Sequence, residues 1–126
     1  MGNKVRAGRI RLKRAYEPPA AADGARILID RLWPRGVSKA ELAIDRWVKD
    51  LAPSTALRKW FGHDPARWQA FRQRYAAEVR EQPGLLRELR RAARQGPVTL
   101  VYSARDEAHN DAVVLRAILL GHWPKS

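Results

Sequence analysis

Residues 98–102 read Val-Thr-Leu-Val-Tyr, the clearest strand signal in the chain. The segment is apolar and rich in β-branched side chains, as expected of a strand covered on both faces. Gln95-Gly96-Pro97 ends a helical pattern just before it, and residues 111–120 form an apolar helical pattern after it. A buried strand between helices predicts an α/β domain with parallel pairing.

Two further strands are predicted nearer the N-terminus. Residues 9–14 alternate between charged and apolar side chains, which favours a half-buried strand at a sheet edge. Residues 26–32 contain a continuous apolar run, typical of a strand buried on both faces, and Trp33-Pro34 ends it. Residues 44–52 fit either a helix or a strand.

Helix-start signals fill the interval before residue 98. Ser38 and Glu41 match a capping box, Ser54 is an N-cap candidate, and Asp64-Pro65 is a cap followed by proline at the first helical position. Residues 83–94 predict another helix. We therefore expect a small three-layer α/β domain over residues 9–123, with a short, mostly parallel, Rossmann-like sheet flanked by helices, and a flexible basic arm at residues 1–8.

Composition limits the class of protein. The 126 residues include no cysteine, which excludes disulfides and a thiolate nucleophile and fits a cytoplasmic location. No apolar run approaches the roughly 20 residues that a membrane span needs, so no membrane association is expected. The net charge of +12 favours acidic partners. The alternative is a GC-rich genome, which encodes arginine where others encode lysine.

Ligands of open parallel sheets bind beyond the carboxyl ends of the strands. The loop Asp30-Arg31-Leu32-Trp33-Pro34-Arg35-Gly36 combines arginines, which bind phosphate or carboxylate through a planar fork, with an aromatic face. The alternative is that Arg31 pairs with an acid and Trp33 caps the core. The ligand-binding candidates in this and the neighbouring loops are Tyr16, Arg31, Trp33, Arg35, Lys49, Ser54, Arg58, Ser103 and Arg105.

Two polar residues before the last helix are candidates for chemistry. Asp106 is a possible general base and Asn110 an orienting amide, but one of them is also expected to cap the helix. The three histidines show no metal-ligand spacing, so no metal and no cofactor is expected. Whether the protein is an enzyme stays open.

Basic stripes offer a second interpretation. One stripe has helical spacing and the other lies on one face of the first strand, and together they could neutralise several phosphates without reading sequence. The alternative is an ordinary solvated surface. The two stripes consist of Arg87, Arg90, Arg91 and Arg94, and of Arg9, Arg11 and Lys13.

Several of these segments resemble the domain of unknown function 488 (YeaO-like) family. The most specific is the sequence of residues 30–36. Residues 13–16, 23–24, 26–29, 47–49, 52–54, 57–58 and 99–104 also match, as does Asn110. The resemblance implies a small cytosolic α/β protein without an established activity. It also implies histidine after Asn110, where this chain has Asp111.

Three functions remain compatible with the sequence. The first is a pocket for an anionic small molecule, phosphate- or nucleotide-like. The second is non-specific nucleic-acid binding through the basic stripes, and the third is a structural or interaction protein without a ligand.

Overall fold

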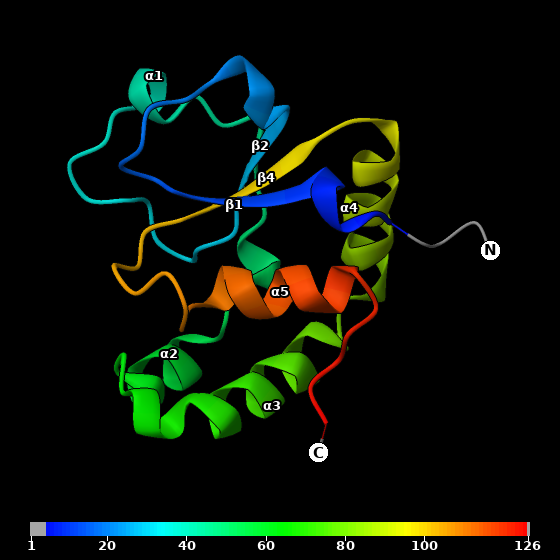
Figure 1. Ribbon diagram of the computed structural model, residues 1–126. Helices are drawn as coiled ribbons and strands as arrows, with labels where there is room; N and C mark the ends of the chain where they lie inside the picture. The colour runs from blue at the N-terminus through cyan, green and yellow to red at the C-terminus, as the bar shows by residue number, and fades with distance from the viewer. Residues whose placement is uncertain (1–4, 126) are drawn as a thin grey trace.

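The computed structural model of the protein describes residues 5–125. Its core is one sheet in the order β1-β4-β2-β3, and every adjacent pair is parallel (Figure 1). The predicted α/β fold with a parallel sheet is confirmed, and β1 lies at an edge as expected. The strands are β1 (Ile10–Arg14), β2 (Ala25–Leu28), β3 (Arg46–Trp47) and β4 (Val98–Tyr102).

Two strands differ from the sequence-based expectation. The ambiguous segment 44–52 contains β3, a two-residue strand that pairs with Ile27 and Leu28 of β2. Strand β2 ends at Leu28 instead of continuing through residue 32. The chain leaves the sheet there because the Asp30 carboxylate and the Trp33 ring make contacts outside the ladder.

The helices begin where the capping signals predicted. Ser38 accepts from the Glu41 N–H in a capping box, and Ser54 accepts from the Leu57 N–H. Asp64 caps a short 3-10 turn, Pro65–Arg67, that leads into α3. The α-helices are α1 (Lys39–Leu42), α2 (Thr55–Phe61), α3 (Trp68–Val79), α4 (Pro83–Gln95) and α5 (Asp111–Leu119).

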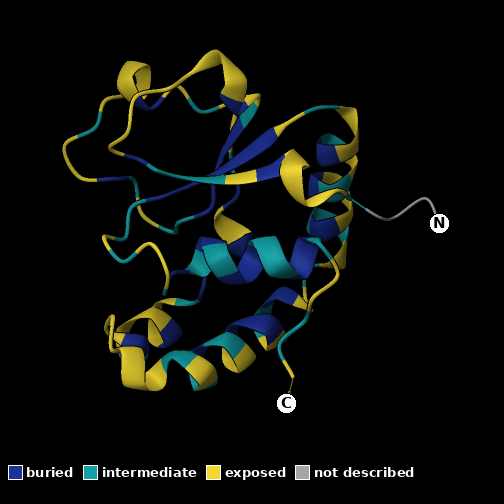
Figure 2. Cartoon of the chain, viewed as in Figure 1, coloured by how far each residue is buried: buried dark blue, intermediate teal, exposed yellow. Residues whose placement is uncertain are grey.

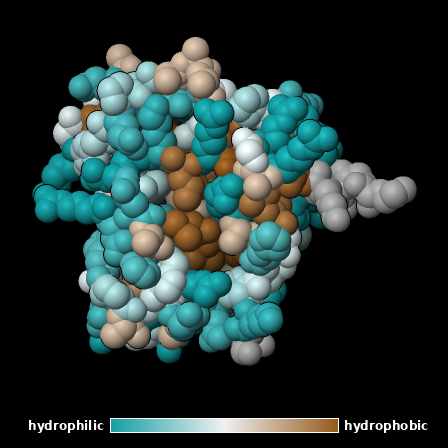
Figure 3. Space-filling model, viewed as in Figure 1, coloured by the Kyte–Doolittle hydropathy of each residue, from teal (hydrophilic) through white to brown (hydrophobic). Residues whose placement is uncertain are grey.

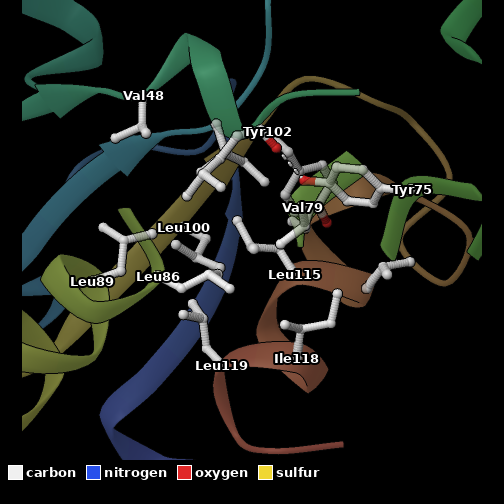
Figure 4. Packing of buried hydrophobic residues seen from close by; sticks show 14 of the residues in the cluster. Val48, Tyr75, Val79, Leu86, Leu89, Leu100, Tyr102, Leu115, Ile118 and Leu119 are labelled. Atoms are coloured by element: carbon white, nitrogen blue, oxygen red, sulfur yellow. Dashed lines mark hydrogen bonds between the residues drawn. The ribbon is translucent and has the colours of Figure 1, made fainter. Parts of the chain in front are cut away.

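The two faces of the sheet are covered unequally. Leu100 and the neighbouring apolar side chains of one face pack against α3, α4 and α5, which form the main core (Figures 2 and 4). Figure 4 shows Leu86 of α4 and Leu115 of α5 meeting this face. The other face carries a smaller cluster in which Leu28 and Val101 meet Leu42 of α1. One helical layer is therefore thick, whereas the other consists of a short helix and loops.

A buried ion network stabilises the edge of that thinner layer. Asp23 lies 2.6 Å from Arg26 and 3.1 Å from Lys13. Arg26 also donates two hydrogen bonds to the Leu42 carbonyl, which joins β2 to the end of α1.

Gly24, just before β2, has a φ of +63°, and a Cβ there would lie 2.1 Å from a Pro97 backbone oxygen. Glycine is required at this position, since any side chain would collide with the backbone before β4.

The carboxyl ends of β1, β2 and β4 lead into loops that gather on the left of Figure 1, next to the start of α5. Residues 1–4 of the predicted basic arm lie outside the described residues, and Ala7–Arg9 form a 3-10 turn. Between residues 5 and 125, no helix has the length and hydropathy needed to cross a membrane. Figure 3, drawn in the view of Figure 1, shows an apolar area near the centre of the molecule, surrounded by hydrophilic side chains.

Candidate functional site

The strand-end loops enclose a cavity of about 670 Å³. This volume lies within the range of about 300–1,000 Å³ that is usual for small-molecule sites. The cavity brings together side chains from the ends of β1, β2 and β4, from α2 and from the first turn of α5. The predicted site residues that line it are Tyr16, Arg31, Trp33, Arg35, Arg58, Ser103, Arg105, Asp106 and Asn110.

Two predicted residues lie elsewhere. Lys49 places its ammonium 4.0 Å from the centre of the Trp47 ring, in a cation–π contact. Ser54 caps α2 and donates a hydrogen bond of 2.6 Å from its hydroxyl to Glu78 of α3. Neither residue lines the cavity, because each is already engaged with a neighbouring element.

Asp30 organises the inner part of the cavity. Its Oδ2 atom accepts hydrogen bonds from the Ser103 N–H at 2.8 Å and from the Ser103 hydroxyl at 2.7 Å. Its backbone carbonyl accepts from the Trp47 indole at 2.6 Å. One residue thereby joins the ends of β2, β3 and β4. Ser103, which the sequence indicated as a ligand contact, is also a structural link.

Asp111, in the first turn of α5, lines the cavity together with Asp30. Burial of the Asp111 carboxyl group raises its pKa well above 3.8. The nearby Asp30 carboxylate raises this pKa further. With its pKa raised, Asp111 keeps its proton to a higher pH than an exposed carboxyl group does. Asp111 also stands at the position where the family resemblance implied histidine, so this departure lies on the cavity wall.

The two arginines of the 30–36 loop have different roles. Arg31 donates to the Pro53 carbonyl at 3.1 Å and to the Ala52 carbonyl at 3.4 Å, so its guanidinium ties this loop to the segment before α2. Arg35 is exposed at the rim of the cavity. The alternative in which Arg31 pairs with an acid is replaced by these carbonyl contacts, and Arg35 is the more exposed of the two arginines.

Aromatic side chains shape the walls. The Trp33 indole donates to the Val37 carbonyl at 2.6 Å and meets Trp47 edge to face, with centroids 5.4 Å apart. This arrangement combines both sequence interpretations, since Trp33 covers the smaller core cluster and still lines the cavity. The Tyr16 hydroxyl donates to the Arg35 carbonyl at 3.1 Å, which connects the first two strand-end loops.

In the loop before α5, both candidates for chemistry make hydrogen bonds to the chain itself. Asn110 is buried and caps α5, accepting from the Val113 N–H at 3.0 Å. Asp106 accepts from the backbone N–H groups of Ala108 and His109 and from the His109 ring. The Ala108 N–H bond and then the His109 ring contact are the largest causes that lower the Asp106 pKa. These bonds favour a loop-ordering role for Asp106 over that of a proton carrier.

Helix α2 also supplies a basic side chain to the cavity. Arg58 is exposed and lines the cavity, and His63 follows the end of the same helix with a φ of +57°. Left-handed backbone is uncommon outside glycine, although histidine is among the residues that tolerate it better.

Four polar residues line the cavity but are absent from the predicted binding set: His63, His109, Asp30 and Asp111. The only sequence signal for Asp30 was its place after a strand, and for Asp111 its departure from the family pattern.

Titratable side chains do not assemble a metal site in the described part of the chain. No group of three or more histidine or acidic residues is arranged to hold a cation there. The cavity is lined by exposed arginines and by the less exposed carboxyl groups of Asp30 and Asp111.

Comparisons with known proteins agree with the resemblance seen in the sequence. Residues 9–126 match the family described as "Inactive DUF488-N3 subclade". The chain is 44% identical to "Uncharacterized protein YeaO" of Escherichia coli (strain K12) over 106 residues, covering 84% of this chain and 92% of that protein. It is 40% identical to "Uncharacterized protein Rv3073c" of Mycobacterium tuberculosis (strain H37Rv) over 117 residues, or 93% and 98% of the two chains. No solved structure matches. The chain belongs to the YeaO-like DUF488 family, in its inactive N3 subclade.

Proposed function

We propose that the protein binds a small anionic molecule, phosphate- or nucleotide-like, at the carboxyl ends of its strands. One observation carries the proposal. Exposed arginines from three separate segments, Arg35, Arg58 and Arg105, line the same cavity. Among the described residues, none of the three forms an ion pair with a protein carboxylate. Arginine forks in such a position suit a phosphate or carboxylate.

Binding without turnover is the form of this function that we favour. The subclade to which the chain belongs is described as inactive. Asp106 is held by hydrogen bonds within its own loop, and Asn110 is used as a helix cap. These contacts leave the two candidates for proton transfer engaged in folding, which supports a binding role.

A thermal-shift screen at about 150 mM salt tests the proposal, with inorganic phosphate, sugar phosphates, nucleotides and dicarboxylates as ligands. A ligand present at about 100 times its dissociation constant adds about 2.7 kcal/mol of stability. For a domain of this size that corresponds to a shift of roughly 10 °C. The shift should disappear in the variant Arg35→Ala/Arg58→Ala/Arg105→Ala.

A matched variant provides the control. Arg87, Arg91 and Arg94 are exposed on α4 and do not line the cavity. Their replacement by alanine lowers the net charge by the same amount as the cavity variant does. Because the cavity is untouched, the ligand-induced shift in melting temperature should stay intact. An equal loss of the shift in both variants would mean that net charge, and not the cavity, attracts the anion.

Non-specific nucleic-acid binding is the second candidate, supported by the net charge of +12 and the exposed arginines of α4. Two cations of the predicted basic stripes already have partners within the protein. Arg90 donates to the carbonyls of Ile118 and Leu119, and Lys13 is paired with Asp23. If a short DNA duplex binds through the remaining arginines of α4, its affinity should fall when Arg87, Arg91 and Arg94 are replaced by alanine. Replacement of the three cavity arginines should leave the affinity unchanged, and the affinity should decrease steeply with added salt. If no ligand of either kind stabilises the protein, a structural or interaction role is left.

A further inference from the structure

The cavity has two chemically different ends. The exposed arginines Arg35, Arg58 and Arg105 occupy the rim, whereas Asp30 and Asp111 are more enclosed. An anionic group is attracted to the rim by the guanidinium charges. The same group is disfavoured at the inner end, where the carboxyl groups of Asp30 and Asp111 both line the cavity. A ligand that fills the cavity should therefore have an anion at one end only.

The inner end is ordered before any ligand arrives. Asp30 is held by two hydrogen bonds from Ser103 and, through its carbonyl, by the Trp47 indole. Asp111 accepts from the Ala112 N–H at 2.9 Å in the first turn of α5. Both carboxyl groups are thus fixed by the backbone of different elements. Fixed acceptors that need no rearrangement lose little entropy when a ligand binds.

Carboxyl oxygens at the inner end select the type of group that meets them. A carboxylate accepts hydrogen bonds, and a protonated carboxyl group both donates and accepts. Alcohol hydroxyl groups do both as well, so adjacent hydroxyls on a sugar ring match such a pair. The pKa of Asp111, raised mainly by burial and then by Asp30, favours the state in which the pair holds one proton.

We propose that the Asp30–Asp111 pair binds the hydroxyl groups of a phosphorylated sugar whose phosphate lies at the arginine rim. This inference rests on the proposed anion-binding function and specifies its ligand class. The sugar phosphate is either free or part of a nucleotide, because both present the same hydroxyls and phosphate. Dicarboxylates and other ligands with an anion at each end bind weakly, since the second anion meets the two carboxyl groups.

Calorimetric titration of the full chain at pH 7 tests this assignment with three compounds: ribose 5-phosphate, AMP and n-propyl phosphate. Propyl phosphate keeps the phosphate but has no hydroxyls. We expect at least one ribose compound to bind about tenfold or more tightly than propyl phosphate. Tighter binding of AMP identifies the nucleotide form, and tighter binding of ribose 5-phosphate identifies the free sugar phosphate; either result supports the assignment.

Two variants locate the effect. Asp111→Ala should weaken the ribose compounds about tenfold, to the level of propyl phosphate, and should leave propyl phosphate unchanged. Asp111→Asn keeps a donor and an acceptor at this position and should retain most of the preference. The comparison of the three ligands on the unmodified protein stands on its own if Asp111→Ala does not fold.

The failures of the two proposals are distinguishable. If all three phosphates bind equally to the unmodified protein, the sugar assignment is overturned while the anion pocket stands. The same holds if Asp111→Ala weakens all three to the same extent. If none of the three binds, the anion pocket itself is rejected and the sugar assignment with it.

Discussion

The carboxylate of Asp30 accepts two hydrogen bonds from Ser103, one from the backbone N–H at 2.8 Å and one from the hydroxyl at 2.7 Å. The two residues follow β2 and β4, which are neighbours in the sheet. Their contact continues the link between these strands beyond the last ladder hydrogen bonds. It also places a carboxyl group at the inner end of the cavity.

Replacing Ser103 by alanine removes only the hydroxyl bond and leaves the backbone bond in place. Hydrogen bonds to charged groups contribute about 1.5–3 kcal/mol, and here one of two is lost. We expect Ser103→Ala to lower the free energy of unfolding by about 1–2 kcal/mol, measured by urea denaturation. A change below about 0.3 kcal/mol would show that the Ser103 hydroxyl does not support the loop.

The arginines of the 30–36 loop should separate in a stability measurement. Arg31→Ala removes the bonds to the Pro53 and Ala52 carbonyls and should cost about 1–3 kcal/mol. Arg35→Ala removes an exposed side chain and should change stability by less than about 0.5 kcal/mol. Both values come from the same denaturation experiment. A large loss of stability in Arg35→Ala would remove the ground for assigning it to ligand binding.

Arg90 provides a similar contrast on α4. It donates to the Leu119 and Ile118 carbonyls at 3.1 and 2.9 Å, at the C-terminal end of α5. A cation at this end of a helix satisfies free carbonyls and interacts favourably with the helix dipole. Arg90→Ala should lower the thermal stability by about 1–3 kcal/mol. Arg91→Ala, on the exposed side of the same helix, should have an effect within about 0.5 kcal/mol; equal effects would contradict the capping role.

Asp111 should make stability depend on pH. Its pKa is raised in the folded protein, chiefly by burial and then by Asp30. Above its ordinary value of 3.8, the unfolded chain releases this proton while the folded chain keeps it. The stability contribution of Asp111 is therefore fully present below pH 3.8 and is lost as the pH rises through the folded pKa.

Asp111→Asn removes this titration and keeps a group of similar shape. The variant should gain stability relative to the unmodified protein as the pH rises, because only the unmodified protein loses stability there. Urea denaturation at pH 4, 6 and 8 measures the difference. A difference that stays the same at all three values would show that Asp111 has no raised pKa.

Much of the fold follows from local patterns. Strand β4 has the predicted bounds of residues 98–102, and the caps at Ser38, Ser54 and Asn110 each act within four residues of their partners. Such signals are short-range, so the sequence contains them completely. The strand β3 was harder to predict, since two residues of extended chain depend on the pairing with β2.

The candidate site was only partly predictable. The rule for parallel strand ends indicated the loops after β2 and β4, and Arg35 and Arg105 of these loops line the cavity. Arg58, which also lines the cavity, belongs to α2. Lys49 and Ser54 are also predicted as ligand contacts, but they contact Trp47 and Glu78, which spacing along the chain does not reveal.

The pair of Asp30 and Asp111 was not predicted for the same reason. The two residues are far apart in the sequence, and they share a cavity because α5 packs against β1 and β4.

The most direct test of the anion pocket is an NMR titration of the isotope-labelled protein with the phosphate ester that most raises its melting temperature. Backbone amide signals report which segments the ligand approaches. The pocket predicts shifts concentrated in residues 30–36 and 103–111, with those of α4 unchanged. Shifts confined to Arg87–Arg94, or spread evenly over the basic surface, would contradict a specific site at the strand ends.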